Sequence, residues 1–217
     1  MNSNDKRVLN KEQKKQANEF WSKYTKRYDL DYCSYYTSRS GEYNFSYMPD
    51  NLYFAKILPR LNNPKVAYGY TDKAYYDILF KDLRRPKTIF KKVSSVYYDE
   101  LYNLLTYDQC IKLFDQTKEY IIKPTLDSGG GNKIIFTSEL SKKELTTWLI
   151  ENDNYIVQDV IKQHEELNNI HSDSINTIRV VSLLINNKVE ILSTVLRVGV
   201  NSNRVDNFSS GGLVCGI

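Results

Sequence analysis

The order of predicted elements after residue 106 limits the possible folds of this chain of 217 residues more than any other feature. Hydrophobic periodicity and capping residues predict a helix, a strand, a glycine-rich loop, a strand, a helix and then three strands. A doubly wound parallel sheet needs a regular alternation of strand and helix, which is missing here. We therefore predict an α+β fold with a mostly antiparallel sheet.

Capping patterns and apolar runs define these elements. Thr106 with Gln109, and Ser141 with Glu144, have the spacing of capping boxes and predict the starts of two helices. The predicted strands are EYIIKP, KIIF, NYIVQDVI, NTIRVVSLLI and KVEILSTVLRVGV. The last two strands flank the Asn-Asn pair of INNK, which is typical of a hairpin turn.

A basic amphipathic helix is predicted from about residue 10 to residue 26. Its apolar stripe has helical spacing and consists of Ala17, Phe20, Trp21 and Tyr24. Residues 1–27 carry eight basic and three acidic side chains, whereas the rest of the chain carries 22 basic and 23 acidic ones. Electrostatic nucleic-acid binders carry positive charge on their main surface, so we expect no nucleic-acid partner. A contact of this helix with nucleic acid or an anionic membrane stays an alternative, although core packing explains its aromatic stripe better.

The segment between this helix and residue 106 gives weaker signals. Residues 28–50 are rich in Tyr, Ser and Gly without a clear period, and we expect them to be irregular or short-stranded. The other elements expected here are a helix from Asp50 to near Pro59, a helix capped by Thr71 or Asp72, and the strand KTIFKKV after Pro86. The second helix is expected to turn Tyr75, Ile78 and Leu79 inward.

Cysteine and histidine usage excludes several classes of site. Cys33, Cys110 and Cys215 are odd in number and widely spaced, which argues against a disulfide framework or a zinc site. His164 and His171 are too few for most metal or Ser-His-Asp chemistry.

The chain starts without an apolar signal segment, and no stretch approaches the ~18 consecutive apolar residues of a membrane-spanning helix. We therefore expect a cytoplasmic protein without a transmembrane segment.

The segment Tyr120–Lys133, YIIKPTLDSGGGNK, is the most informative for function. Lys123 ends a buried strand, where an ammonium group needs an anionic partner or carries a severe desolvation cost. The glycines at 129–131 leave backbone N–H groups free to approach a phosphate closely. Neither a Walker A motif nor GxGxxG is present. A glycine triplet alone is usually a flexible turn, but the lysine and the loop together indicate one bound anion.

Two later segments place polar groups at strand ends. The backbone of residues 158–161 can pair with the edge of a planar heterocycle, and Glu165 or Glu166 can hold ribose hydroxyls, although alone this is an ordinary strand and charged loop. Arg179 and Arg197 interrupt neighbouring apolar strands, and a guanidinium on a buried sheet face needs a carboxylate or phosphate partner. Either arginine alone could face solvent. Together with DNFSSGG they favour a polar cleft.

These motifs resemble an ATP-grasp enzyme in their order along the chain. The set is Lys73 in TDK, Lys123 in IIKP, the SGGG loop, VQDVI followed by HEE, NTIR, and Arg197 with DNFSSGG. It looks most like the sugar-transfer-associated ATP-grasp group found with bacterial polysaccharide biosynthesis genes. It is also similar, more distantly, to D-alanine–D-alanine ligases and glutamate-adding ligases. The resemblance covers roughly residues 50 to 217.

The resemblance implies two α+β subdomains with mostly antiparallel sheets around a nucleotide cleft. It implies an N-terminal helical or irregular region at 1–70, a lid subdomain at 71–160, and the start of a C-terminal subdomain at 161–217. The implied nucleotide contacts are Lys73 and Lys123 for the phosphates, a flap of Ser128, Gly129, Gly130 and Gly131, an adenine frame of Gln158, Asp159, Val160 and Ile161, and Glu165 near the ribose. The implied catalytic residues are Arg179, Arg197 and Asn207.

The chemistry implied by the resemblance phosphorylates a carboxylate to an acyl phosphate, which an amine or other nucleophile attacks. Its cofactors are ATP and Mg²⁺, and its substrate is a small carboxylate or a sugar-linked compound. Such chemistry depends on charge neutralisation by lysines, arginines and Mg²⁺ more than on a general base.

The metal site departs from the family pattern. ATP-grasp enzymes hold Mg²⁺ with acidic residues and an asparagine downstream of the glycine pair, and nothing follows GGLVCGI here. We therefore assign no metal ligand and expect the chain to be truncated at its C-terminus. Two functions stay open, a carboxylate ligase in cell-surface glycan assembly and a non-catalytic module that binds nucleotide or a partner. The oligomeric state is not predicted.

Overall fold

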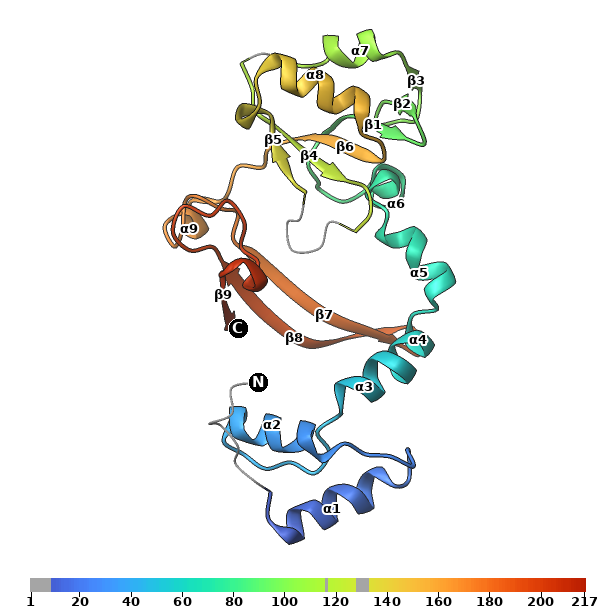
Figure 1. Cartoon of the computed structure of the whole chain (residues 1–217), viewed down its shortest axis with the longest axis vertical. Coiled ribbons are helices and arrows are strands. Elements are labelled where there is room, and N and C mark those ends of the chain that lie inside the picture. The colour runs from blue at the N-terminus through green and yellow to red at the C-terminus, as the bar shows by residue number, and fades with distance from the viewer. Residues whose placement is uncertain (1–8, 116, 128–132) are drawn as a thin grey trace. The chain divides into compact units, whose positions relative to one another are not determined.

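Two units make up the chain in the computed structural model, Met1–Tyr68 and Gly69–Ile217. The structure describes residues 9–115, 117–127 and 133–217 (Figure 1). Within these ranges, none of the helices is both long and apolar enough to cross a membrane.

Two helices build the core of the first unit. α1 (Lys11–Trp21) begins at a capping box in which the side chains of Asn10 and Gln13 each bond the other's backbone N–H, at 2.8 and 2.9 Å. α2 (Leu30–Ser40) packs beside it through a small buried cluster of Leu9, Ala17 and Cys33. The first helix ends earlier than predicted, and Tyr24 is exposed rather than part of the buried stripe.

The expectation that residues 28–50 are irregular or short-stranded is wrong, because they contain α2. Asp29 caps the start of this helix by accepting from the N–H of Asp31, and Gly41 ends it in the left-handed conformation at φ 78°. Only Cys33 and Thr37, one turn apart, are buried on its inner side. This buried stripe is narrow, and one of its two residues, Thr37, is polar. The sequence of α2 therefore shows no helical hydrophobic period.

A run of short helices follows. They are α3 (Asp50–Leu52), the π-helical η1 (Tyr53–Ile57), α4 (Leu58–Leu61), α5 (Pro64–Thr71), the 3₁₀-helix η2 (Lys73–Tyr75) and α6 (Tyr76–Leu79). Pro59 does not end the helical run as expected, because it lies in the first turn of α4, where a missing N–H is tolerated.

The side chains of η2 and α6 face in other directions than predicted. Asp72 caps this segment by accepting from the N–H of Ala74 at 2.9 Å, and its first turn is a 3₁₀-helix. A 3₁₀ turn aligns residues three apart, so Ala74 and Asp77 are buried. Tyr75, Ile78 and Leu79 are instead exposed by 40–57%.

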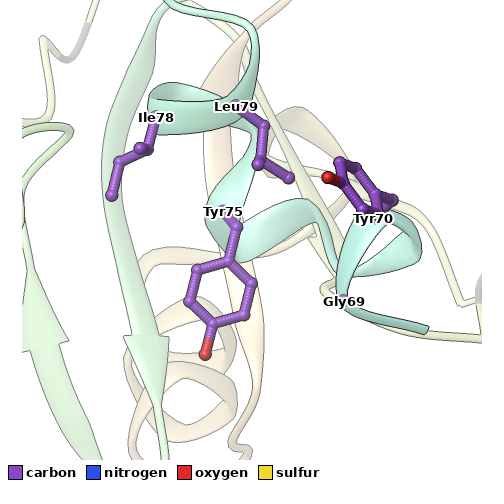
Figure 2. A pocket seen from close by; sticks show the side chains of 5 residues that line it. All are labelled: Gly69, Tyr70, Tyr75, Ile78 and Leu79. Carbon is purple, nitrogen blue, oxygen red and sulfur yellow. The ribbon is translucent and has the colours of Figure 1, made fainter. Parts of the chain in front are cut away.

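These outward side chains border a surface hollow of about 270 Å³, which Gly69 and Tyr70 complete (Figure 2). Its lining is almost entirely apolar.

The second unit contains a six-stranded antiparallel sheet in the order β3-β2-β1-β6-β4-β5. Its strands are β1 (Thr88–Val93), β2 (Val96–Tyr98), β3 (Leu104–Leu105), β4 (Tyr120–Pro124), β5 (Ile135–Phe136) and β6 (Tyr155–Asp159). Its apolar face packs against α7 (Tyr107–Lys112) and α8 (Lys142–Glu151), as Figure 1 shows. Both predicted capping boxes are confirmed at the starts of these helices.

The opposite face of the same sheet carries several polar side chains beside the buried Ile156. Strand residues alternate between faces, so Phe90, Ile122 and Val157 point to the helices while their neighbours point away. The pairing register puts four polar side chains on this second face, which we call the polar face: Thr88, Lys91, Lys123 and Gln158. A β-bulge between Thr88 and Phe90 makes room for one extra residue in β1.

A second sheet has the order β7-β8-β9, also antiparallel, and consists of β7 (Thr177–Ile185), β8 (Lys188–Val198) and β9 (Leu213–Gly216). Asn186 and Asn187 join β7 to β8 with φ values of 51° and 60°, as a type I′ hairpin requires. The short helices α9 (Glu165–Asn168) and η5 (Phe208–Ser210) precede β7 and β9. The predicted hairpin and the α+β class with antiparallel sheets are confirmed.

Candidate functional site

Two lysines distant in sequence lie beside each other on the second unit. Lys73 begins η2, and Lys123 lies near the end of β4. The backbone N–H of Lys73 donates to the carbonyl oxygen of Thr125 at 2.9 Å, and its Nζ donates to the same oxygen at 3.3 Å. Because Thr125 follows Lys123 by two residues, these bonds hold the start of η2 against the end of β4.

The electrostatics of this pair are unfavourable without a ligand. Burial lowers the pKa of Lys123, and the nearby Lys73 ammonium lowers that pKa further. Burial also lowers the pKa of Lys73, against the opposing effect of the Asp72 and Asp127 carboxylates. In the described part of the chain, neither ammonium forms a salt bridge. Two half-buried cations held together in this way suit an anion with several negative charges, such as a polyphosphate.

The amide of Gln158 belongs to the same site. Its Oε1 accepts from Lys123 Nζ at 3.4 Å, and its Nε2 donates to Thr88 Oγ1 at 3.4 Å. Gln158 is only 8% exposed, so its side chain contacts other residues of the sheet. A heterocycle beside β6 would therefore have to bind the backbone of this strand.

The remaining residues of the predicted adenine and ribose contacts follow along the same stretch of chain. Asp159 ends β6 and Val160 follows it, both partly buried, while Ile161 is exposed. The N–H of Asp159 already donates to the carbonyl oxygen of Lys87 at 3.0 Å. Glu165 is exposed in the first turn of α9.

The predicted flap, Ser128, Gly129, Gly130 and Gly131, lies outside the described residues. On either side of it, Asp127 and Lys133 have φ values of 52° and 58°, in the left-handed region.

Two of the predicted catalytic residues, Arg197 and Asn207, meet in a second cluster beside the other sheet. Arg197 Nη2 donates to Asp206 Oδ1 at 2.7 Å and also to the side-chain oxygen of Asn207. Asp206 is 7% exposed and accepts a further hydrogen bond from the hydroxyl of Thr177. The carboxylate partner that the sequence required for a buried arginine is therefore Asp206, supplied by the chain itself.

Arg179 behaves differently from Arg197. The two arginines share one face of the β7–β8 ladder, because Thr177 pairs with Arg197 and Arg179 pairs with Val195. Arg179 is exposed, which agrees with the alternative that this arginine faces solvent.

The glycine pair that follows closes this second cluster. Gly211 has a φ of 92°, and Gly212 donates its N–H to the carbonyl oxygen of Asn207 at 2.9 Å. A Cβ on Gly212 would lie 2.5 Å from the carbonyl oxygen of Asp206. The backbone of Asp206 and Asn207 can thus sit so close to the next strand only if residue 212 has no side chain.

The lysine pair and the arginine cluster are not joined directly by any hydrogen bond or ion pair between described residues. A neighbouring side chain connects their sheets. Arg204, two residues before Asp206, binds both carboxylate oxygens of Glu119 at 3.1 and 2.7 Å and lies 3.3 Å above the Phe136 ring. This contact is not visible in the sequence, because it joins residues 85 positions apart.

A buried ion pair on the polar face was missed as well. Lys91 is fully buried and contacts Asp77 at 2.9 Å. The alternation of the strand KTIFKKV could have indicated it, since Lys91 must face away from its neighbour Phe90.

A magnesium site does not follow from these residues. In the ranges that the structure describes, no group of three or more His, Cys, Asp or Glu side chains could hold a metal ion. Asp206 is committed to Arg197 and Thr177. We therefore assign no chemical step to a metal.

Of the comparisons with known proteins, the one with protein families gave a match. Residues 55–217 match the family described as sugar-transfer associated ATP-grasp, whereas searches of curated proteins and of solved structures gave no match. The match to this family supports ATP binding and an ATP-dependent, ligase-like function. Since the match spans well over half of the residues, the chain belongs to the sugar-transfer associated ATP-grasp family.

Proposed function

We propose that this protein uses ATP to activate a carboxylate as an acyl phosphate, which an amine or other nucleophile then attacks, in the biosynthesis of capsule or cell-surface polysaccharide. The observation that carries this is the pair of half-buried lysines, Lys73 and Lys123, which lie together and form no salt bridge with any described residue. Apposed cations of this kind are stabilised by a polyphosphate. The family match supports the nucleotide, and the cell-surface role is an inference from the family's description.

In the proposed reaction a carboxylate oxygen forms a bond to the γ-phosphorus, and the bond from that phosphorus to the ADP oxygen breaks. The nucleophile then bonds to the acyl carbon, and inorganic phosphate leaves. Lys73 and Lys123 would neutralise charge on the phosphates, which is the main catalytic requirement of phosphoryl transfer. Mg²⁺ bound with ATP would supply further charge neutralisation, for which we assign no ligand among the described residues.

The other predicted residues have distinct roles in this proposal. Residues 128–131 would cover the phosphates as a flap, the backbone of residues 158–161 would frame the adenine, and Glu165 would bind the ribose. Arg197 is oriented by Asp206 and Asn207, so its remaining N–H groups would be aimed at the phosphoryl group or the acyl substrate. Arg179, on the same ladder face, would add a second positive charge.

Thermal unfolding with ATP and Mg²⁺ tests the nucleotide half of this function. Saturating ligand stabilises the native state by about 2.7 kcal/mol at 100 times Kd, so Tm should rise. Lys123→Ala should abolish that rise, whereas Lys188→Ala, at an exposed position in β8, should keep it. An unchanged Tm of the parent protein, or an equal rise in Lys123→Ala, would contradict ATP binding at this site.

A second candidate function is a module that binds nucleotide without turnover. The ion pair of Arg197 with Asp206 favours it. The charge of this arginine is already balanced by buried Asp206, as in an arginine with a purely structural role. Measuring ADP release with a panel of carboxylates and amines separates the two. ATP binding without ADP release for any pair supports the module, and release that requires both a carboxylate and a nucleophile supports the ligase.

A further inference from the structure

A buried polar network lies on the polar face behind the two lysines. At its centre Asp77 contacts three groups, each at 2.9 Å: Lys91 Nζ, Arg85 Nη1 and Thr88 Oγ1. Lys91 is 0% and Asp77 6% exposed. A buried ion pair often adds no stability over apolar residues of similar size, so stability alone does not account for it.

One end of this network reaches Lys73. The Lys91 ammonium donates to the carbonyl oxygen of Ala74 at 3.1 Å, and the hydroxyl of Tyr102 donates to the same oxygen. Ala74 follows Lys73, whose own N–H is bonded to Thr125. The backbone at Lys73 is therefore fixed on both sides.

The Lys91 ammonium has no capacity left for a ligand of its own. Its three N–H groups are matched by Asp77, by the Ala74 carbonyl and by the Tyr102 ring, whose centroid is 3.5 Å from Nζ. Lys91 therefore acts on neighbouring residues rather than on a bound molecule.

The other end of the network reaches Lys123, and its hydrogen bonds have a fixed direction. An ionised Asp77 can only accept, so the single hydroxyl hydrogen of Thr88 must point to it. Thr88 Oγ1 then accepts from the amide nitrogen of Gln158 at 3.4 Å. This turns the amide oxygen of Gln158 toward the Lys123 ammonium, also at 3.4 Å. A reversed amide would direct its own N–H groups at that cation.

We propose that Lys91 and Asp77 form a positioning pair that holds Lys73 and Lys123 at the spacing required by one polyphosphate, through Ala74 on one side and through Thr88 and Gln158 on the other. This inference rests on the proposed function of the two lysines as phosphate ligands. Lys91 and Asp77 themselves do not touch the nucleotide.

Isothermal titration of a non-hydrolysable ATP analogue and of adenosine, well below Tm, tests the positioning pair. Lys91→Met removes the ammonium but leaves Asp77 its contact with Arg85, and Thr88→Val removes only the hydroxyl relay. Each substitution should weaken binding of the ATP analogue about tenfold, close to 1.4 kcal/mol, because the two lysines lose their spacing. Binding of adenosine, which has no phosphate, should be unchanged.

The controls separate positioning from general damage. Thr88→Ser keeps the hydroxyl and should restore binding of the analogue, and Thr147→Val makes the same chemical change at an exposed site on α8. Equal weakening of the analogue and adenosine would overturn the inference, as would parent-like affinity in Thr88→Val. If Lys91→Met does not fold, Thr88→Val alone decides. Failure of the proposed function gives a different result, in which the parent does not bind the analogue or Lys123→Ala binds it equally well.

Discussion

At the scale of single residues, Lys123 shows how burial and position mark a candidate binding group. A strand-ending lysine beside a proline suggested an anion site in the sequence, and the structure adds a second cation, Lys73, close enough to lower the pKa of Lys123. The hydrogen bond from Lys123 to Gln158 is neutral at its acceptor, so it orients the ammonium without balancing its charge. The attraction of an anionic ligand to both ammonium groups would offset the desolvation penalty and the repulsion.

Gly212 is a residue whose replacement should damage the second cluster. In Gly212→Ala the new Cβ would meet backbone atoms of Asp206 and Asn207 at 2.5–2.9 Å, so we expect a loss of roughly 1–3 kcal/mol in the free energy of unfolding. Gly216→Ala is the matched control, because no atom of the described residues lies within 4 Å of the new Cβ. Urea unfolding measures both, and equal midpoints for the two variants would refute the steric argument.

At the scale of elements, the two ends of α8 differ in how far the sequence reveals them. Its start follows from Ser141 and Glu144, which are neighbours in sequence. Its end depends on Lys92, a residue of β1 whose Nζ donates to the carbonyl oxygens of Leu149, Ile150 and Asn152 at 3.3, 2.9 and 2.7 Å. Local motifs are visible in a sequence, whereas a cap supplied from another element is not.

The C-terminal cap of α8 gives a direct stability prediction. Lys92→Met should lower the free energy of unfolding by about 1–3 kcal/mol, because partly buried carbonyl groups lose a charged donor. Lys143→Met, on the exposed side of the same helix, should change it by less than about 0.5 kcal/mol. Chemical denaturation compares the variants, and similar losses in both would show that Lys92 does not cap the helix.

At the scale of the whole molecule, the sequence predicted the antiparallel α+β class, because periodicity and turn residues such as Asn186 and Asn187 are local. It missed α2, whose buried side is limited to Cys33 and Thr37. For the candidate site, the sequence singled out Lys73 and Lys123 but not Asp77 and its partners, since that network depends on which strands pair.

The contact of Arg204 with Glu119 links the two sheets of the second unit and should be sensitive to acid. The hydrogen bonds from Arg204 lower the pKa of Glu119 below its ordinary value of 4.5. The ion pair therefore stabilises the folded protein fully above pH 4.5, and this stabilisation is lost as the pH falls through the lowered pKa of Glu119. Both side chains are about one-third exposed, so we expect about 1 kcal/mol or less.

Arg204→Met tests this link by urea unfolding at a series of pH values. The difference in stability between the parent and the variant should be constant above pH 4.5 and should shrink at more acidic pH. A difference that does not vary with pH would mean that Glu119 and Arg204 contribute packing rather than an ion pair.

The central claim is that Lys73 and Lys123 bind the phosphates of one ATP molecule. An experimental structure with a non-hydrolysable ATP analogue measures it most directly, through the distances from the two Nζ atoms to the phosphate oxygens. We predict that both distances fall at about 2.7–3.2 Å on a single nucleotide, with the adenine beside residues 158–161. A nucleotide bound elsewhere, or phosphates that contact neither lysine, would contradict the claim.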